Sequence, residues 1–185
     1  AVRPEGRSNP RQLLITEKTV GALARLVEET RRAAAERHGP ARPLVLVLQL
    51  THAGRFAKPE GRSAPIIAQH NPALDARLHL PSDHPLVSDS YLDELQEDYV
   101  RAAALAARAG FDGVDLKACH GYLVSELLAA HTRTYSRYGG AFENRARFLT
   151  ETLRKVGAGT PGVFLAARLN MVDSVPWPYG FGARP

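Results

Sequence analysis

AGFDGVDLKACHGYLVSELLAAHTRTYSRYGGAFENRARFL, residues 109–149, is the stretch that decides the fold. It predicts the end of a helix, a buried strand, a polar turn, a short helix, a glycine pair and the start of another helix. Lys117, His120 and Tyr122 crowd into the turn where the strand ends. In a parallel α/β protein the loops beyond the strand carboxyl ends form the mouth of the active site. The stretch therefore predicts both a fold class and the place of a site.

Three short apolar runs are typical of strands buried on both faces, and they cover residues 44–50, 113–116 and 163–169. Helical patterns alternate with these runs. They extend from Thr16, the expected N-cap, to Gly39; from Ser88 or Ser90 to Gly110; and from Phe142 to Gly157 or Gly159. This alternation predicts parallel strands joined by right-handed crossovers. An open doubly wound sheet and a (β/α)8 barrel both fit it, and three strands complete neither.

Two stretches break this rhythm. Residues 56–85 hold five prolines and no clear period, and we expect them to cap the site, with a mobile surface insert as the alternative. Residues 172–185 are rich in proline and glycine and are expected to form a loop tail. The length of 185 residues otherwise suits one domain.

The composition excludes several classes of protein. An apolar content of 44% and a charged content of 23% are typical of a soluble globular protein, and no apolar run is long enough to cross a membrane. The single cysteine, Cys119, rules out internal disulfides and suits the cytoplasm. The net charge of +5 does not predict nucleic-acid binding, because arginines alternate with glutamates as on a solvated helix face. No metal-binding spacing occurs among the histidines, so we expect no metal site.

Each predicted strand carries a long polar side chain near its carboxyl end. Gln49, Lys117 and Arg168 are in phase with the inward positions of a barrel, where they would converge on one mouth. Two cations and an amide suit an electron-rich ligand on which negative charge develops. The alternative is that each residue only pairs locally, for example Lys117 with Asp115.

His120 and Tyr122 follow in the same turn. A histidine can donate a hydrogen bond or move a proton near neutral pH, and a phenol can protonate a carbanion. An ordinary polar role is the alternative for His120, but its place in a strand-end turn beside Gly121 favours the functional one.

Several motifs together resemble the old yellow enzyme family of FMN-dependent oxidoreductases. They are PEGRSNPRQL (4–13), QLTHAGR (49–55), AGFDGVDL (109–116), HGYL (120–123) and YGGAFENRARFLTE (138–151). The resemblance implies a partial (β/α)8 barrel, from the end of barrel strand 2 through strand 5 and the following loop. Residues 1–185 would then be one incomplete barrel domain, without strand 1 and strands 6 to 8.

The resemblance also implies roles for single residues. Gln49 would bind the pyrimidine edge of FMN, and Arg168 would lie near its N1 and C2 oxygen. His120 would anchor the substrate, and Tyr122 would be the proton donor. Lys117 stands where the family commonly has a histidine, so it would contact either the substrate or the reduced flavin.

The implied activity is transfer of a hydride from NAD(P)H, through FMN, to an activated alkene such as an enone. Two alternatives are an amine dehydrogenase or dienoyl-thioester reductase with an iron–sulfur cluster elsewhere, and a catalytically silent barrel fragment. The partner would be a small molecule rather than nucleic acid or membrane, and a homo-oligomer stays open. Because the family binds the FMN phosphate with later strands, we expect this chain alone to bind FMN poorly and to be inactive.

Overall fold

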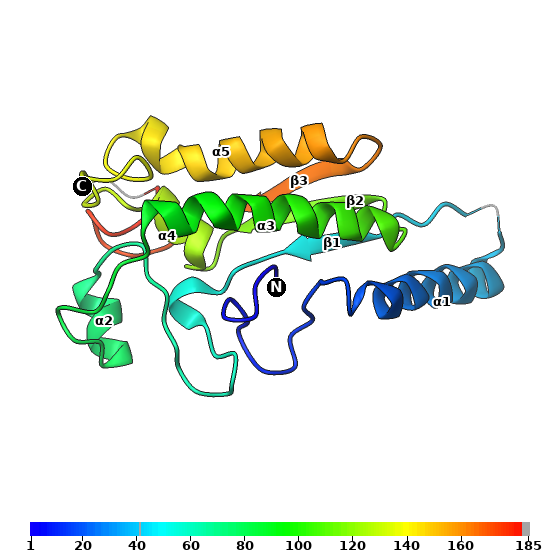
Figure 1. The fold of residues 1–185 in the computed structure, drawn as a ribbon, viewed down its shortest axis with the longest axis horizontal. Coiled ribbons are helices and arrows are strands. Elements are labelled where there is room, and N and C mark those ends of the chain that lie inside the picture. Colours follow the sequence, from blue (N-terminus) through cyan, green and yellow to red (C-terminus); the bar gives the residue numbers. More distant parts are fainter. Residues whose placement is uncertain (41, 183–185) are drawn as a thin grey trace.

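A parallel three-stranded sheet, in the order β1–β2–β3, forms the centre of the molecule (Figure 1). The structure is a computed structural model that describes residues 1–40 and 42–182. Its strands are β1 (Val47–Leu50), β2 (Gly113–Ala118) and β3 (Phe164–Leu169). Its helices are α1 (Val20–His38), α2 (Pro72–Leu78), α3 (Asp89–Arg108), α4 (Leu123–Leu128) and α5 (Phe142–Gly159), with a 3-10 turn η1 at Gly54–Phe56. The predicted alternation of helices and parallel strands is confirmed.

Helices α3 and α5 lie along one face of the sheet (Figure 1). Helix α3 begins where predicted, because the Ser88 hydroxyl accepts a hydrogen bond of 3.1 Å from the Tyr91 amide. Its buried side chains recur at helical spacing and include Leu95 and Tyr99. Tyr99 meets Phe148 of α5 edge to face, with ring centroids 6.1 Å apart. This apolar contact joins the two crossover helices above β2.

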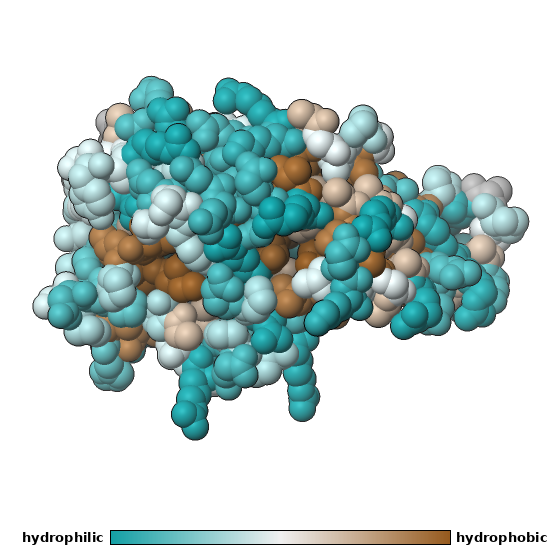
Figure 2. Space-filling model, viewed as in Figure 1, coloured by the Kyte–Doolittle hydropathy of each residue, from teal (hydrophilic) through white to brown (hydrophobic). Residues whose placement is uncertain are grey.

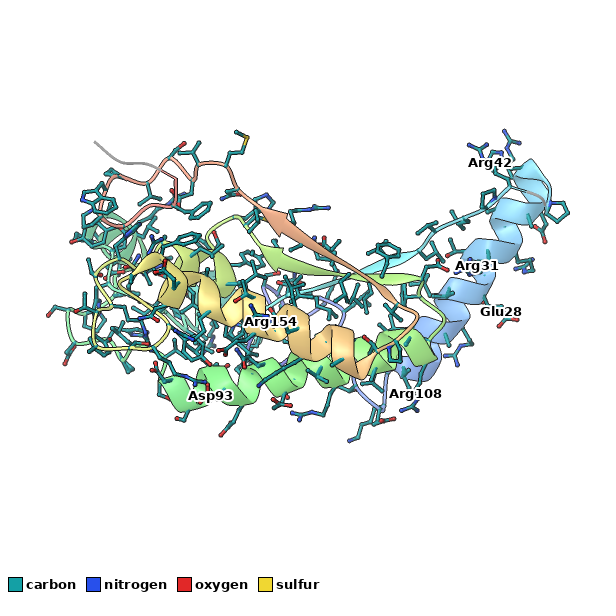
Figure 3. All side chains as sticks on the ribbon, turned by 90° about the horizontal axis from the view of Figure 1, so that it is seen from above. Glu28, Arg31, Arg42, Asp93, Arg108 and Arg154 are labelled. Carbon is teal, nitrogen blue, oxygen red and sulfur yellow. The ribbon has the colours of Figure 1, made fainter. Side chains whose placement is uncertain are left out.

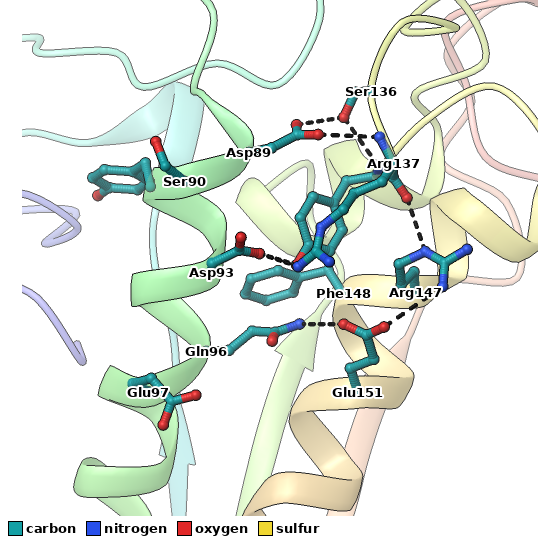
Figure 4. Close-up of polar contacts among 12 residues, drawn as sticks. Asp89, Ser90, Asp93, Gln96, Glu97, Ser136, Arg137, Arg147, Phe148 and Glu151 are labelled. Carbon is teal, nitrogen blue, oxygen red and sulfur yellow. Dashed lines mark hydrogen bonds and ion pairs between the residues drawn. The ribbon is translucent and has the colours of Figure 1, made fainter.

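Polar contacts extend the junction between α3 and the segment that leads into α5 (Figure 4). Asp89, the first residue of α3, accepts hydrogen bonds from the Ser136 hydroxyl at 2.6 Å and from the Arg137 amide at 3.1 Å. Further along, Gln96 donates to Glu151 of α5 at 3.2 Å. The loop before the glycine pair is thereby fixed to the start of α3.

The opposite face of the sheet is open, and here one prediction is wrong. The three apolar runs were expected to be buried on both faces. This holds for β2, whose residues 113–116 are all buried, but not for β1 and β3, where Val47 is 42% exposed and Phe164 is 45% exposed. The reason is that α3 and α5 cover only one face, while no described segment covers the other. Figure 2 shows the side of the molecule on which α3 lies, where apolar side chains reach the surface between polar helix faces. The open face carries the polar residues of the candidate site.

The ends of several elements also differ from the prediction; β2, for example, continues to Ala118 beyond the predicted end at Leu116. The first strand begins at Val47 rather than at residue 44, since the preceding residues do not join the ladder with β2. Helix α1 begins at Val20 with Thr19, not Thr16, at the N-cap position. The Thr19 hydroxyl is held by the Leu14 carbonyl at 2.6 Å, and the Thr16 carbonyl accepts from the Val20 amide at 2.9 Å. The predicted stop at Gly39 is confirmed.

The proline-rich segment 56–85 contains one short helix that its lack of period hid. The Asn71 side chain accepts a hydrogen bond of 3.2 Å from the Leu74 amide, and Pro72 occupies the first position of α2. The predicted tail follows β3 without regular structure, and residues 183–185 of it lie outside the described residues.

Charged side chains point outward from the helices, as the alternation of arginine and glutamate predicts (Figure 3). Arg32 and Glu36 pair one turn apart on α1 at 3.0 Å, and Arg108 at the end of α3 pairs with Glu17 at 2.8 Å. No helix in the described part of the chain is both long and apolar enough to span a bilayer.

His52, just beyond β1, is buried and gives stability a pH dependence. Its Nδ1 accepts from the Gly54 amide at 3.1 Å, and its Nε2 lies 2.8 Å from the Tyr91 hydroxyl. Burial, followed by the positive charges of Arg3 and the amino terminus, lowers the pKa of His52 from 6.5 to about 3. The folded state thus keeps this ring neutral where the unfolded chain protonates it.

We therefore expect the free energy of unfolding to fall by about 1.4 kcal/mol per pH unit as the pH drops from 6.5 towards 3. Above pH 6.5 this contribution is complete, because the ring is neutral in both states. Urea unfolding at several pH values measures the slope, and a His52→Gln variant should flatten it. A His38→Gln variant, at an exposed histidine, is the control. Equal slopes in His52→Gln and the unaltered protein would contradict the assignment.

Candidate active site

The carboxyl ends of the three strands bring polar side chains onto the open face of the sheet. Gln49 pairs with Asp115 in the β1–β2 ladder, and Lys117 pairs with Arg168 in the β2–β3 ladder. Because residues two apart on a strand share a face, all four side chains stand on the same side of the sheet. The predicted convergence of Gln49, Lys117 and Arg168 is thus the arrangement that the register produces.

Asp115 lies at the centre of this group, and the sequence prediction did not assign it to the site. Its Oδ2 accepts a hydrogen bond of 2.6 Å from the Gln49 amide nitrogen and lies 3.8 Å from the Arg168 Nε. Its Oδ1 is buried and has no partner in the described structure. Asp115 fixes the orientation of the Gln49 amide by accepting from its nitrogen. Its position two residues before Lys117 could have predicted that the two side chains share a face of the sheet.

Lys117 does not pair with Asp115, so the local ion pair considered for it is absent from the structure. Its ammonium instead lies 3.5 Å from the centroid of the Tyr122 ring. A cation over an aromatic face is attracted by the ring but keeps its charge. The ring of Phe56 also lies near Tyr122, with ring centroids 6.5 Å apart. Lys117 and Tyr122 therefore form one unit, which places the phenol beside the cationic end of β2.

His120 occupies the turn that follows β2 and adopts a left-handed backbone conformation, with φ of 62°. This conformation is uncommon for a residue with a side chain and is found at functional turns. His120 is exposed and lines a cavity of about 220 Å³ together with residues from three segments. The cap segment contributes Phe56, Asn71 and Leu74, α4 contributes Ser125 and Glu126, and the tail contributes Asp173, Val175 and Tyr179. The structure thus places His120 in this cavity, beside the Lys117–Tyr122 unit in sequence.

A buried ion cluster forms one wall of the same cavity, and the sequence prediction missed it. Arg55 in η1 is 1% exposed, and its guanidinium binds Glu126 of α4 at 2.8 Å and Asp75 of α2. Its remaining nitrogen donates to the Gln69 carbonyl at 2.7 Å. Arg55 is the last residue of the QLTHAGR motif, so this motif could have pointed to Arg55 as a residue of the site. The cluster ties segment 56–85 to α4, the helix that follows the turn of His120.

Gly54 explains why this motif needs a glycine before the arginine. Its φ is 59°, and a Cβ built there would lie 2.6 Å from the backbone nitrogen of Leu123. The turn after β1 therefore approaches the start of α4 more closely than any side chain allows. Cys119 is buried next to the site, and burial raises the pKa of its thiol, which suits a packing role rather than a nucleophile.

Comparison with known proteins identifies the family. The model of the NADH:flavin oxidoreductase / NADH oxidase family matches residues 3–177. The chain belongs to this family. It is 34% identical over 159 residues to an NADPH dehydrogenase of Bacillus velezensis. The aligned region covers 84% of this chain but only 42% of that relative. Most of this chain aligns with such curated relatives, but it spans less than half of their length.

Solved structures agree with this family assignment. An Old Yellow Enzyme from Pichia superimposes with a TM-score of 0.69 and 25% identity, over 91% of this chain and 44% of that one. Morphinone reductase superimposes with a TM-score of 0.69 and 28% identity, over 91% of this chain and 47% of that one. The predicted partial (β/α)8 barrel of the old yellow enzyme family is confirmed.

Proposed function

We propose that this chain supplies the substrate-facing part of an FMN-dependent oxidoreductase that transfers a hydride from NAD(P)H to an activated alkene. The observation that carries the proposal is the array of Gln49, Asp115 and Arg168 on one face of the sheet, beside the phenol of Tyr122. The family membership supports the choice of cofactor. When bound, FMN supplies the hydride carrier between the nicotinamide and the substrate.

The donor and acceptor atoms of this array fit the edge of a flavin. A flavin pyrimidine ring presents an N–H between two carbonyl oxygens, and the Gln49 amide offers both an acceptor and a remaining donor. The Arg168 side chain is 59% exposed, and only its Nε lies near Asp115, so its other guanidinium nitrogens are available as cationic donors. The unpartnered Oδ1 of Asp115 is a buried acceptor that lacks a donor. These residues would hold the pyrimidine edge of FMN.

The remaining groups carry the proton chemistry at the substrate. His120 would donate a hydrogen bond to the substrate oxygen, which draws negative charge from the alkene. The Tyr122 hydroxyl would give its proton to the α-carbon, and solvent would restore it. Lys117 holds the ring of Tyr122 from one side and adds positive charge next to the developing anion. The cap segment would exclude water from this chemistry through its contact with α4.

Absorbance spectroscopy tests the proposal directly. We expect the protein that carries the remaining barrel strands of its relatives to purify with visible flavin bands, and we expect residues 1–185 alone to lack them. The flavin-containing protein should oxidise NAD(P)H faster when an enone is added under nitrogen. A colourless whole protein that cannot take up added FMN would overturn the proposal. Anaerobic oxidation of amines, without reduction of enones, would instead support the amine dehydrogenase alternative.

A further inference from the structure

The turn that carries Tyr122 leads directly from β2 into α4, and backbone hydrogen bonds fix its path. The Tyr122 amide donates to the Cys119 carbonyl at 3.3 Å, and the Leu123 amide donates to the His52 carbonyl at 3.2 Å. These bonds place the α-carbon of Tyr122 but do not choose its side-chain rotamer, because the ring still turns about its own bonds. The direction of the phenol hydroxyl therefore depends on what packs against the ring.

Phe56 packs against this ring and against the glycine that precedes it. The ring centroids of Phe56 and Tyr122 are 6.5 Å apart, with their planes inclined by 42°. A Cβ built at Gly121 would lie 3.1 Å from the Cε2 atom of Phe56, which is tighter than ordinary van der Waals contact. The Phe56 ring thus fills the space beside Gly121, and its removal would open a gap next to the phenol.

The 3-10 turn η1 holds Phe56 on a rigid support. Its amide donates to the Ala53 carbonyl at 3.1 Å, and Ala53 and Ala57 on either side of the turn are fully buried. The preceding residue, Arg55, is anchored to Glu126 of α4 at 2.8 Å. Two adjacent side chains of η1 therefore contact both α4 and the turn that leads into it. A ring on such a support can fix the rotamer of a neighbouring side chain.

We propose that Phe56 is a positioning residue that holds the Tyr122 phenol in the orientation from which it gives up its proton. This inference rests on the proposed function and deepens it, because it assigns a residue that acts through the proton donor. Proton transfer needs the donor within hydrogen-bond reach of the accepting carbon, and a misplacement of about 1 Å can cost about 100-fold in rate. Phe56 also lines the cavity of about 220 Å³ that His120 enters, so the test must separate positioning from contact with the substrate.

Kinetics of the flavin-containing protein with its remaining barrel strands provide the first test. We expect Phe56→Ala to lower kcat for alkene reduction at least about tenfold and to change KM less than about threefold. Stopped-flow reduction of the flavin by NAD(P)H should stay unchanged, because that half of the reaction does not use the phenol. Phe56→Tyr keeps the ring and should retain most of the activity. Phe142→Ala, at an exposed phenylalanine of α5, is the matched control.

A double-mutant cycle shows whether Phe56 acts through Tyr122. In a Tyr122→Phe background, Phe56→Ala should cause no further loss of kcat, because the group that it positions is already gone. Equal losses with and without the phenol would overturn the inference, and so would a loss confined to KM, which would make Phe56 a wall for the substrate. Phe56→Leu keeps the apolar volume without the flat ring, and the same cycle applies to it should Phe56→Ala fail to fold.

Fluorine NMR of protein labelled with meta-fluorotyrosine follows the phenol without turnover. The signal of Tyr122 is the one that Tyr122→Phe lacks. We expect it to be sharp and distinct from that of Tyr135, which is 72% exposed, and to broaden or move towards that signal in Phe56→Ala. An unchanged signal would overturn the inference. A change that depends on Phe56 in a whole protein that never binds flavin would support the contact and overturn the proposed function. A flavoprotein that reduces enones with an unaltered kcat in Phe56→Ala would overturn the inference alone.

Discussion

Replacement of Tyr122 by phenylalanine is expected to lower kcat for alkene reduction about 100- to 10,000-fold, the range that a positioned general acid contributes. Phenylalanine keeps the ring that carries the Lys117 ammonium at 3.5 Å and the contact with Phe56. The substitution therefore removes the hydroxyl and little else. Stopped-flow mixing of the reduced protein with the alkene measures the loss.

Two further readouts distinguish a proton donor from a merely structural tyrosine. Flavin content and the affinity for a saturated substrate analogue should change little in Tyr122→Phe, because the aromatic ring remains. In deuterated water the unaltered protein should place deuterium at the α-carbon with one stereochemistry, and the variant should lose that control. Tyr135→Phe, at a tyrosine that is 72% exposed, is the matched control. A loss of less than about threefold in Tyr122→Phe would mean that another group donates the proton.

Strand phase alone located most of the candidate site. Gln49, Lys117 and Arg168 were chosen because each ends a strand on one side of its pleat, and parallel pairing then forces them onto one face. Helix ends were predictable where a side chain caps the backbone, as Ser88 does for α3. The residues that lie on regular elements therefore followed from periodicity.

The residues that the sequence did not reveal depend on contacts between distant segments. Arg55 meets Glu126 from 71 positions away and Asp75 from 20, and no local period marks such a partnership. The Lys117 ammonium contacts the Tyr122 ring rather than the neighbouring Asp115, because the Asp115 carboxylate already accepts a hydrogen bond from Gln49 across the ladder. The apolar run that contains Phe164 wrongly predicted burial on both faces. An apolar run does not tell whether the chain itself covers the second face of a sheet.

The buried arginine cluster leads to the largest expected effect on stability. Arg55 is 1% exposed, and the Glu126 carboxylate that it binds at 2.8 Å also accepts from the Ala68 amide at 2.9 Å. Burial raises the pKa of Glu126 despite this partner, so the folded protein holds the charged form at a cost. The arginine is the group that makes that charge tolerable.

Arg55→Met is therefore expected to lower the free energy of unfolding by about 3–5 kcal/mol, the usual cost of leaving one partner of a buried pair alone. Urea unfolding measures this loss, and Arg32→Met, which breaks an exposed pair with Glu36, should cost less than about 1 kcal/mol. Adding Glu126→Gln to Arg55→Met should recover part of the stability, because it removes the stranded charge. Similar losses in Arg55→Met and Arg32→Met would show that solvent reaches the cluster. Because the same arginine joins α2 to α4, the destabilised variant should also expose the cap segment to proteolysis before the sheet unfolds.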